Sequence, residues 1–216
     1  ENFESCRAAL QEQLQKTEQK LDAAAHNLSK IRRNYAKRLE TQIIEGLRDL
    51  NFLHVAFEIS FEKTKSYTEN GTDAVEFLIS TNPGEAIRPL AKVVSGGELS
   101  RIMLAIKTIL ADRDETETLI FDEIDTGISG RTAQKVSEKM AQIGQRHQVI
   151  CITHLPQIAA MADSHFEIEK NVEENDTVTS IHPLSEEDSV RELARMLGGA
   201  KITDAVLESA WEMKKM

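Results

Sequence analysis

The chain has 216 residues, of which 40% are hydrophobic, 29% charged and only 5% aromatic, and its formal net charge is −10. This length allows one large domain or two small ones. No apolar run approaches the roughly 18 residues that a membrane span needs, and no signal-peptide pattern is present, which argues against a membrane or secreted protein. The first residue is Glu1 rather than Met, and we interpret it as an excision point inside a longer protein.

The two cysteines, Cys6 and Cys151, lie in different segments and do not make a disulfide framework. We therefore expect a reducing, cytoplasmic environment. The charge is unevenly distributed, because residues 1–50 carry nine basic and eight acidic side chains, whereas the remainder carries 17 and 28. The acidic charge of the residues after position 50 argues against broad nonspecific nucleic-acid binding by that part of the chain.

Residues 1–50 predict one long helix with a coiled-coil seam. Apolar and small residues recur every seven positions in two series, offset by four, like the a and d positions of a heptad repeat. The first series is Phe3, Leu10, Thr17, Ala24 and Ile31, and the second is Leu14, Leu21, Leu28 and Tyr35. A narrow seam of this kind needs a partner helix, which is another chain or an absent upstream segment of this protein. The alternative is an amphipathic helix packed on a globular body, although its apolar stripe is usually wider.

One dense basic cluster lies on this helix, and it is the one candidate for local DNA contact. It contains Lys30, Arg32, Arg33, Lys37 and Arg38. Basic side chains on an exposed helix can meet nucleic-acid phosphates. The alternative interpretation is an ordinary solvated helix face.

A hairpin is predicted after the helix. Residues 54–62 and 74–80 alternate apolar and polar side chains, which is the period of half-buried strands. Residues 69–72 supply the turn between them, with Gly71 free to adopt positive φ.

From residue 96 onward, helical and strand patterns alternate. Helices are predicted at 98–112, 131–143, 155–161, 185–197 and 203–216, with strands at 117–122, 148–153 and 164–170 and an edge strand at 178–182. Short apolar strands separated by helices are typical of an α/β body with a parallel sheet. We expect Ser185 to cap the helix at 185–197 and Gly198 and Gly199 to terminate it.

Asp122 and Glu123 follow the buried strand at 117–122. Ligands bind at the carboxyl edge of parallel sheets, where an Asp can hold Mg²⁺ beside phosphates and an adjacent Glu can polarise an attacking water. Two acids at a strand end are common, however, and on their own they more often mark a solvated strand terminus.

Ser95, Gly96, Gly97 and Glu98 lead directly into a helix. Paired glycines let the backbone approach a ligand closely, and the free N–H groups of a helix start bind phosphate. The alternative is a glycine turn that Ser95 caps. His154 likewise follows a predicted strand and can bond a phosphate or orient water, although a single histidine in a turn often has no such role.

Together these segments resemble the C-terminal half of an SMC-type ABC ATPase, and most closely the RecN family of bacterial DNA-repair proteins. The resemblance covers residues 92–171, with Val93-Val-Ser-Gly-Gly-Glu-Leu-Ser-Arg-Ile-Met-Leu-Ala, Phe121-Asp-Glu-Ile-Asp-Thr-Gly-Ile-Ser-Gly130 and Thr153-His-Leu-Pro-Gln-Ile-Ala159, and the tail Glu192-Leu-Ala-Arg-Met-Leu-Gly-Gly. The Gly-x-x-x-x-Gly-Lys-Ser/Thr phosphate loop is missing from the chain. The resemblance therefore implies half of a nucleotide site.

The resemblance implies the fold and the organisation of the chain. Residues 1–50 would be the descending coiled-coil arm, and residues 51–216 the C-terminal lobe of an α/β ATPase head, with a parallel sheet flanked by helices. The partners would be the N-terminal half of the same protein, which supplies the phosphate loop and ascending coil, a second head by homodimerisation, and DNA, within the cytoplasm and nucleoid of a bacterium. The cofactors would be ATP and Mg²⁺.

The resemblance also implies roles for individual residues. Ser95, Gly96, Gly97 and Glu98 would contact the γ-phosphate of ATP held by the opposite head. Asp122 would be the metal carboxylate, Glu123 the catalytic base and His154 the switch histidine. Residues 125–130 would couple two sites across the dimer, through Asp125 or Ser129.

Within residues 125–130 the sequence departs from many SMC proteins, since Thr126-Gly127-Ile128-Ser129 replaces Ala-Ala-Leu-Asp. This favours the RecN family over other SMC-like chromosome-maintenance ATPases. The full set of motifs also argues against a non-catalytic coiled-coil interaction module, and the long arm argues against a transporter subunit. We expect ATP hydrolysis by the complete protein and none by this chain alone.

Overall fold

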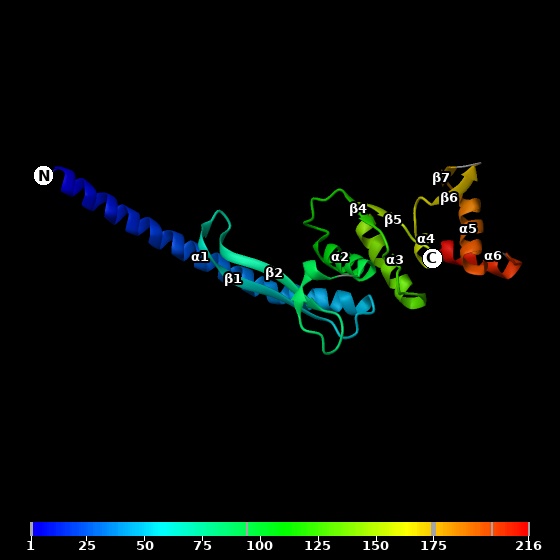
Figure 1. Ribbon diagram of the computed structural model, residues 1–216, viewed down its shortest axis with the longest axis horizontal. Helices are drawn as coiled ribbons and strands as arrows, with labels where there is room; N and C mark the ends of the chain where they lie inside the picture. Colours follow the sequence, from blue (N-terminus) through cyan, green and yellow to red (C-terminus); the bar gives the residue numbers. More distant parts are fainter. Residues whose placement is uncertain (1, 94, 174–175, 200, 216) are drawn as a thin grey trace. The chain divides into compact units, whose positions relative to one another are not determined.

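The computed structural model describes residues 2–93, 95–173, 176–199 and 201–215, and Figure 1 gives the order of its elements. The chain forms two compact units, one made of Glu1–Glu45 and His54–Lys92 and the other of Gly46–Leu53 and Val93–Met216. Val94 of the Ser-Gly-Gly segment and Met216, the predicted end of the last helix, lie outside the described residues.

The predicted long helix is confirmed as α1, Asn2–Asp49. Its apolar seam is exposed, with Phe3 and Tyr35 retaining 81% and 64% of their accessible surface and the leucines between them also exposed. A different face of the same helix is buried, along Ala25 and Ala36. The helix therefore has one face already covered within its unit and a second face, the heptad seam, most of which is exposed among the described residues.

The predicted hairpin is confirmed and is longer than expected. Strand β1, Ala56–Thr68, pairs antiparallel with β2, Gly71–Ser80, and the register shifts at a bulge between Lys63 and Thr68. Gly71 adopts a φ of 88° in the tight turn, as its place in the sequence predicts. The short strand β3, Arg88–Pro89, extends the sheet beside β2, and the 3-10 helix η1, Leu90–Lys92, follows it.

The hairpin runs along α1 (Figure 1), and polar contacts fix it there. The Asp73 side chain, which is 5% exposed, accepts a 2.7 Å hydrogen bond from Ser29 Oγ and forms an ion pair with Arg32. Arg32 also donates to the carbonyl of Asn70 at 2.7 Å, and the Arg33 guanidinium lies 4.7 Å from the centre of the Phe61 ring. Buried hydrogen-bonded charge of this kind fixes the register of the hairpin on the helix.

Contacts at the two ends of the hairpin complete this attachment. Glu40 Oε1 accepts a 2.8 Å bond from the Ile59 backbone N–H near the base of the hairpin. Near its tip, the Tyr67 hydroxyl donates to Asp22, and this hydrogen bond raises the pKa of Tyr67. The hairpin is thus held to the helix from Asp22 to Glu40.

The second unit contains the predicted alternation of helices and strands. Its elements in chain order are α2, Gly96–Leu110; β4, Thr118–Phe121; α3, Gly130–Gly144; β5, Gln148–Cys151; and α4, Pro156–Ala159. Strands β4 and β5 are parallel, with Thr118 opposite Gln148 and Phe121 opposite Cys151, as the short apolar runs predict. Leu119 and Phe121 point into the core, whereas Ile120 on the other face is 67% exposed.

One strand prediction is wrong in its pairing. The strand at 164–170 was expected to extend the parallel sheet, but β6, Phe166–Glu173, pairs antiparallel with β7, Asp176–Pro183, in a separate two-stranded sheet. Its sequence alternates apolar and charged side chains, and that alternation suits a half-exposed antiparallel strand better than a doubly covered parallel one.

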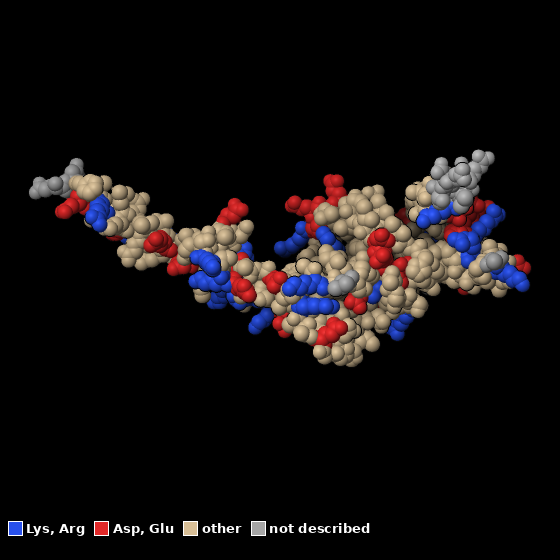
Figure 2. Space-filling model, viewed as in Figure 1, with Lys and Arg blue, Asp and Glu red and all other residues tan. Residues whose placement is uncertain are grey.

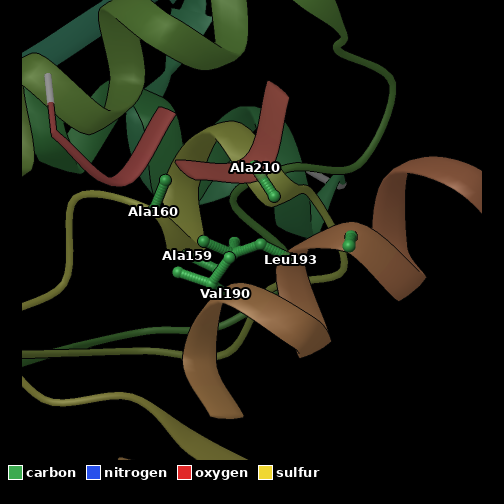
Figure 3. Packing of buried hydrophobic residues seen from close by; sticks show 6 residues of the cluster. Ala159, Ala160, Val190, Leu193 and Ala210 are labelled. Carbon is green, nitrogen blue, oxygen red and sulfur yellow. The ribbon is translucent and has the colours of Figure 1, made fainter. Parts of the chain in front are cut away.

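The last two helices form a small hydrophobic core (Figure 3). Helix α5, Glu186–Gly198, and helix α6, Asp204–Lys214, pack with the end of α4, and their buried side chains are Ala159, Ala160, Val190, Leu193, Ala194 and Ala210. Ser185 caps α5 by accepting a bond from Asp188 N at 3.1 Å, and Gly199 ends it with a φ of 65°, as predicted. No described helix is both long and apolar enough to cross a membrane.

Candidate functional site

The carboxyl edge of the β4–β5 sheet brings together the acidic pair and the histidine that the sequence singled out. Asp122 and Glu123 follow β4 directly, and His154 lies three residues after β5. The pairing continues past the strands, because the Ile152 N–H donates to the Phe121 carbonyl at 3.0 Å. Parallel strands end at the same edge, so residues 32 positions apart in sequence become neighbours by topology.

Helix α2 starts beside the same edge. Ser95 is its N-cap, and Ser95 Oγ accepts a long 3.4 Å bond from the backbone N–H of the half-buried Glu98. One turn later, Ser100 Oγ donates to the Asp122 carbonyl at 2.8 Å. These bonds hold the free N–H groups of the helix start next to the loop that follows β4.

The two glycines at this helix start are in close contact with Glu123. A β-carbon on Gly96 would overlap the Glu123 carboxylate, well inside 3.0 Å. A β-carbon on Gly97 would lie 2.9 Å from the Glu123 carbonyl oxygen and 2.9 Å from Thr126 Cβ. A side chain at Gly97 would require the backbone of the acidic loop to move, whereas one at Gly96 would displace the end of the Glu123 side chain, and both conflicts favour glycine.

Glu123 itself is held in an unusual backbone conformation. Its φ of 55° is in the left-handed region, which side chains with a β-carbon rarely occupy. Asp122 Oδ1 accepts a 2.8 Å bond from the Glu123 N–H and supports that turn. Such strain is concentrated at sites where a side chain must point in a set direction.

Asp125 is buried beneath the carboxyl edge of the sheet and connects the loop after β4 to the loop after β5. The residue is 3% exposed, and its Oδ2 accepts bonds from Thr153 Oγ1 at 2.6 Å and from the His154 backbone N–H at 2.7 Å. The Nδ1 atom of the His154 ring lies 3.0 Å from the same oxygen, while the His154 side chain is 73% exposed. One buried carboxylate thus joins the loop after β4 to the loop after β5.

Arg101 is a residue of this site that the sequence analysis missed. It is buried, and its Nη1 donates to the carbonyls of Ile124 at 3.2 Å and Thr126 at 2.7 Å. Its guanidinium also lies 5.5 Å from the centre of the Phe52 ring. Burial lowers the pKa of Arg101, but an arginine stays protonated in proteins. In the sequence, its burial is indicated by its spacing of three and four residues from the apolar Leu104 and Ala105, which are also buried.

Ser129 is placed differently from Asp125. It is the N-cap of α3, yet its hydroxyl makes no capping hydrogen bond and is exposed. Gly127 and Gly130 on either side have positive φ angles of 76° and 50°. The segment that follows the acidic pair therefore ends at an exposed Ser129 hydroxyl that caps no helix N–H.

Asp122 offers one exposed carboxylate, and one of its oxygens already accepts the Glu123 N–H. No group of three or more His, Cys, Asp or Glu side chains in the described part of the chain is arranged to hold a metal ion by itself. A single carboxylate is a common protein contribution to Mg²⁺ whose other ligands are phosphates and water. The residues present therefore fit Mg²⁺ that arrives with a nucleotide.

Cys151 does not add a nucleophile to the site. Burial, together with the charges of Asp125 and Asp122, raises the pKa of its thiol to about 12. The group is therefore a neutral thiol near pH 7, and a neutral thiol is a poor nucleophile.

The basic cluster on α1 divides into two sets. Arg32 and Arg33 are engaged with the hairpin through Asp73 and Phe61. Lys30, Lys37 and Arg38 are exposed and have no contact of this kind with the hairpin among the described residues, whereas Arg33 is exposed but stacks on Phe61. Figure 2 shows basic and acidic side chains next to each other along α1 rather than a field of one sign.

Comparison with curated proteins identifies close relatives. The chain is 45% identical to the DNA repair protein RecN of Halalkalibacterium halodurans over 94% of its length, and 41% identical to that of Bacillus subtilis over its whole length. RecN of Vibrio cholerae is 43% identical over 88% of the chain. The matches span 35–40% of the length of these relatives. No family model matches the chain.

Among solved structures, the Smc head domain of Pyrococcus yayanosii, with its coiled coil and joint, has the same fold. The TM-score is 0.62 at 17% sequence identity, over 89% of this chain and 35% of that one. At this identity the likeness concerns the fold alone, and it matches an α/β lobe that carries a coiled-coil helix.

Proposed function

Because the chain belongs to the RecN family, we propose that it is the C-terminal part of an ATPase that acts in recombinational repair of DNA double-strand breaks. One observation carries the proposal: a glycine-paired helix start, a strand-end acidic pair and a strand-end histidine meet at one sheet edge. This set can bind phosphate and activate water, which are the two requirements of nucleotide hydrolysis.

In this proposal each residue has a distinct role. Ser95, Gly96, Gly97 and Glu98 contact the γ-phosphate of ATP held by a second head. Asp122 holds Mg²⁺, which neutralises charge on the phosphates when the nucleotide is bound. Glu123 takes a proton from the attacking water, and His154 orients the water or the γ-phosphate. The close packing of Gly96 and Gly97 on Glu123 supports a shared site.

The absent partner of this chain is, we propose, the N-terminal half of the full-length protein, which brings the phosphate loop. Two surfaces support this. On the β4–β5 sheet, Ile120, Ile150 and Ile152 are 67%, 45% and 50% exposed, although parallel sheets are normally covered on both faces. The heptad seam of α1 is exposed as well, and an ascending helix from that half would cover it.

ATPase measurements on separated halves test this proposal. We expect no steady hydrolysis by residues 1–216 alone or by the N-terminal half alone, and hydrolysis by the mixture. Ser95→Arg should remove it, because the larger side chain occupies the phosphate position at the helix start. Steady hydrolysis by residues 1–216 alone that Glu123→Gln abolishes would refute the half-site proposal. An associated but inactive mixture would favour an interaction module.

We also propose that DNA phosphates contact Lys30, Lys37 and Arg38, the members of the basic cluster that are not engaged with the hairpin. Reversal of Lys30, Lys37 and Arg38 to Glu in the full-length protein should weaken DNA binding. It should also flatten the dependence of log affinity on log salt by about one for each phosphate that the variant no longer neutralises. Reversal of Arg7, Lys16 and Lys20 on the same helix makes the same charge change and serves as the control. Equal effects of the two triple variants would contradict a local contact.

A further inference from the structure

Asp125 is a buried carboxylate whose polar contacts all come from one short segment. Its carboxylate is 4% exposed, and a single oxygen, Oδ2, has three nitrogen or hydroxyl groups within 3.0 Å. All three belong to Thr153 and His154, the residues that follow β5. A buried carboxylate is stable only when donors surround it. The donors here are concentrated on the backbone and ring of one histidine and on the residue before it.

The short distance between the ring nitrogen and the carboxylate favours one position for the proton of His154. Nδ1 is 3.0 Å from an anionic oxygen, and a lone pair on Nδ1 at that distance would be repelled. Nδ1 therefore bears a proton, and the neutral ring has its lone pair on Nε2. Because the His154 side chain is 73% exposed, the rest of the ring faces outward from the sheet edge.

We propose that Asp125 is the positioning residue for His154, fixing the ring with its proton on Nδ1 and presenting Nε2 to the nucleotide. When the ring is neutral, Nε2 accepts a hydrogen bond from water. When the ring is protonated, Nε2 donates to a phosphate oxygen. Thr153 holds the same carboxylate from the side and also accepts a 3.0 Å bond from the Leu155 N–H, so the whole turn is braced.

This assignment also separates the two candidates for coupling between heads. The carboxylate of Asp125 faces inward and is occupied by its own chain. Ser129 is exposed and its hydroxyl has no capping bond. Contact with a second head therefore belongs to Ser129, while Asp125 acts within its own head through His154.

The inference rests on the proposed ATPase function, and a double-mutant cycle in the full-length protein tests it. Asp125→Asn should lower kcat about 10- to 100-fold, a typical effect of removing the partner that orients a functional histidine. In a His154→Ala background the same change should lower kcat less than about two-fold, because the group that Asp125 positions is gone. Asp112→Asn, at an exposed ion pair with Arg146, is the matched control and should leave kcat unchanged.

Independent, multiplicative effects of the two substitutions would overturn the inference. They would leave the proposed function intact if Glu123→Gln still abolishes turnover. Conversely, turnover that survives Glu123→Gln would refute the proposed function without bearing on the position of the histidine ring. The two failures are therefore distinguishable.

A second measurement needs no hydrolysis and no altered Asp125. In full-length protein labelled with ¹⁵N only at histidine, the His154 signal is identified by its disappearance in His154→Gln. The neutral ring should have its proton on Nδ1, the less common tautomer of free histidine. If Asp125→Asn folds, its amide N–H₂ faces the ring and should move the proton to Nε2. A wild-type ring with its proton on Nε2 would overturn the inference directly.

Discussion

Replacement of Glu123 by Gln should reduce ATP turnover by the full-length protein about 10²- to 10⁴-fold, while nucleotide binding persists. Gln has the shape of Glu but cannot accept a proton from water. The substitution retains the left-handed backbone at this position, and the contact with Gly96 remains possible because the two side chains have the same length. Steady-state ATPase assays, together with a nucleotide-binding titration of the same protein, measure the two effects separately.

Glu117→Gln is the matched control for this prediction. It makes the same chemical change at an exposed residue that precedes β4, so it lies at the opposite end of the strand from Glu123. Turnover by this variant should match the wild type. If both variants reduced activity equally, the effect would reflect a change of net charge, and Glu123 would not be the base.

Gly97→Ala should destabilise the second unit by about 1–3 kcal/mol and abolish turnover. The new β-carbon would lie 2.9 Å from both the Glu123 carbonyl oxygen and Thr126 Cβ. Neither atom can move without the backbone, and that backbone is already fixed by Arg101 through the Ile124 and Thr126 carbonyls. The loop that bears Glu123 and Asp125 must therefore shift. Thermal unfolding measures the change in stability of the full-length protein, and ATPase assays measure its turnover.

Two other glycine variants separate steric conflict from helix propensity. Gly96→Ala displaces only the flexible end of the Glu123 side chain, so stability should change little while turnover falls. Gly144→Ala meets no atom within 4 Å at the end of α3 and should be neutral or stabilise by up to about 1 kcal/mol. An equal decrease of stability in all three variants would contradict the close packing at Gly97.

Much of the first unit was predictable, because its periodicities are strong. The sequence predicted one long helix over residues 1–50, which α1 confirms, and the seam that was predicted to need a partner helix is exposed. The second face of α1 was not predictable. It is formed by alanines and by polar residues such as Ser29 and Arg32, and these two polar residues are bonded to Asp73 on a distant strand. A contact made by hydrogen bonds between remote segments leaves no periodic signal.

The candidate site shows the same division. The residues with a local pattern, Asp122, Glu123 and His154, were found because strand ends and motif spacing mark them. The inward role of Asp125 was not found, because burial of an acid among polar neighbours depends on Thr153 and His154, which follow another strand. Arg101 was missed for a related reason. Its partners are backbone carbonyls, and because every residue has one, the residue types at those positions give no sign of the contact.

The hairpin should also stiffen the part of α1 to which it is bonded. It is bonded to the helix from Asp22 to Glu40, a length of about 27 Å at 1.5 Å per residue. Bending of this stretch would have to break the Asp73 and Glu40 bonds, whereas no described strand braces residues 2–21. Within this unit, bending is therefore expected mainly in the part of α1 that precedes Asp22. The stretch from Asp22 to Glu40 should stay straight and carry force along the helix axis.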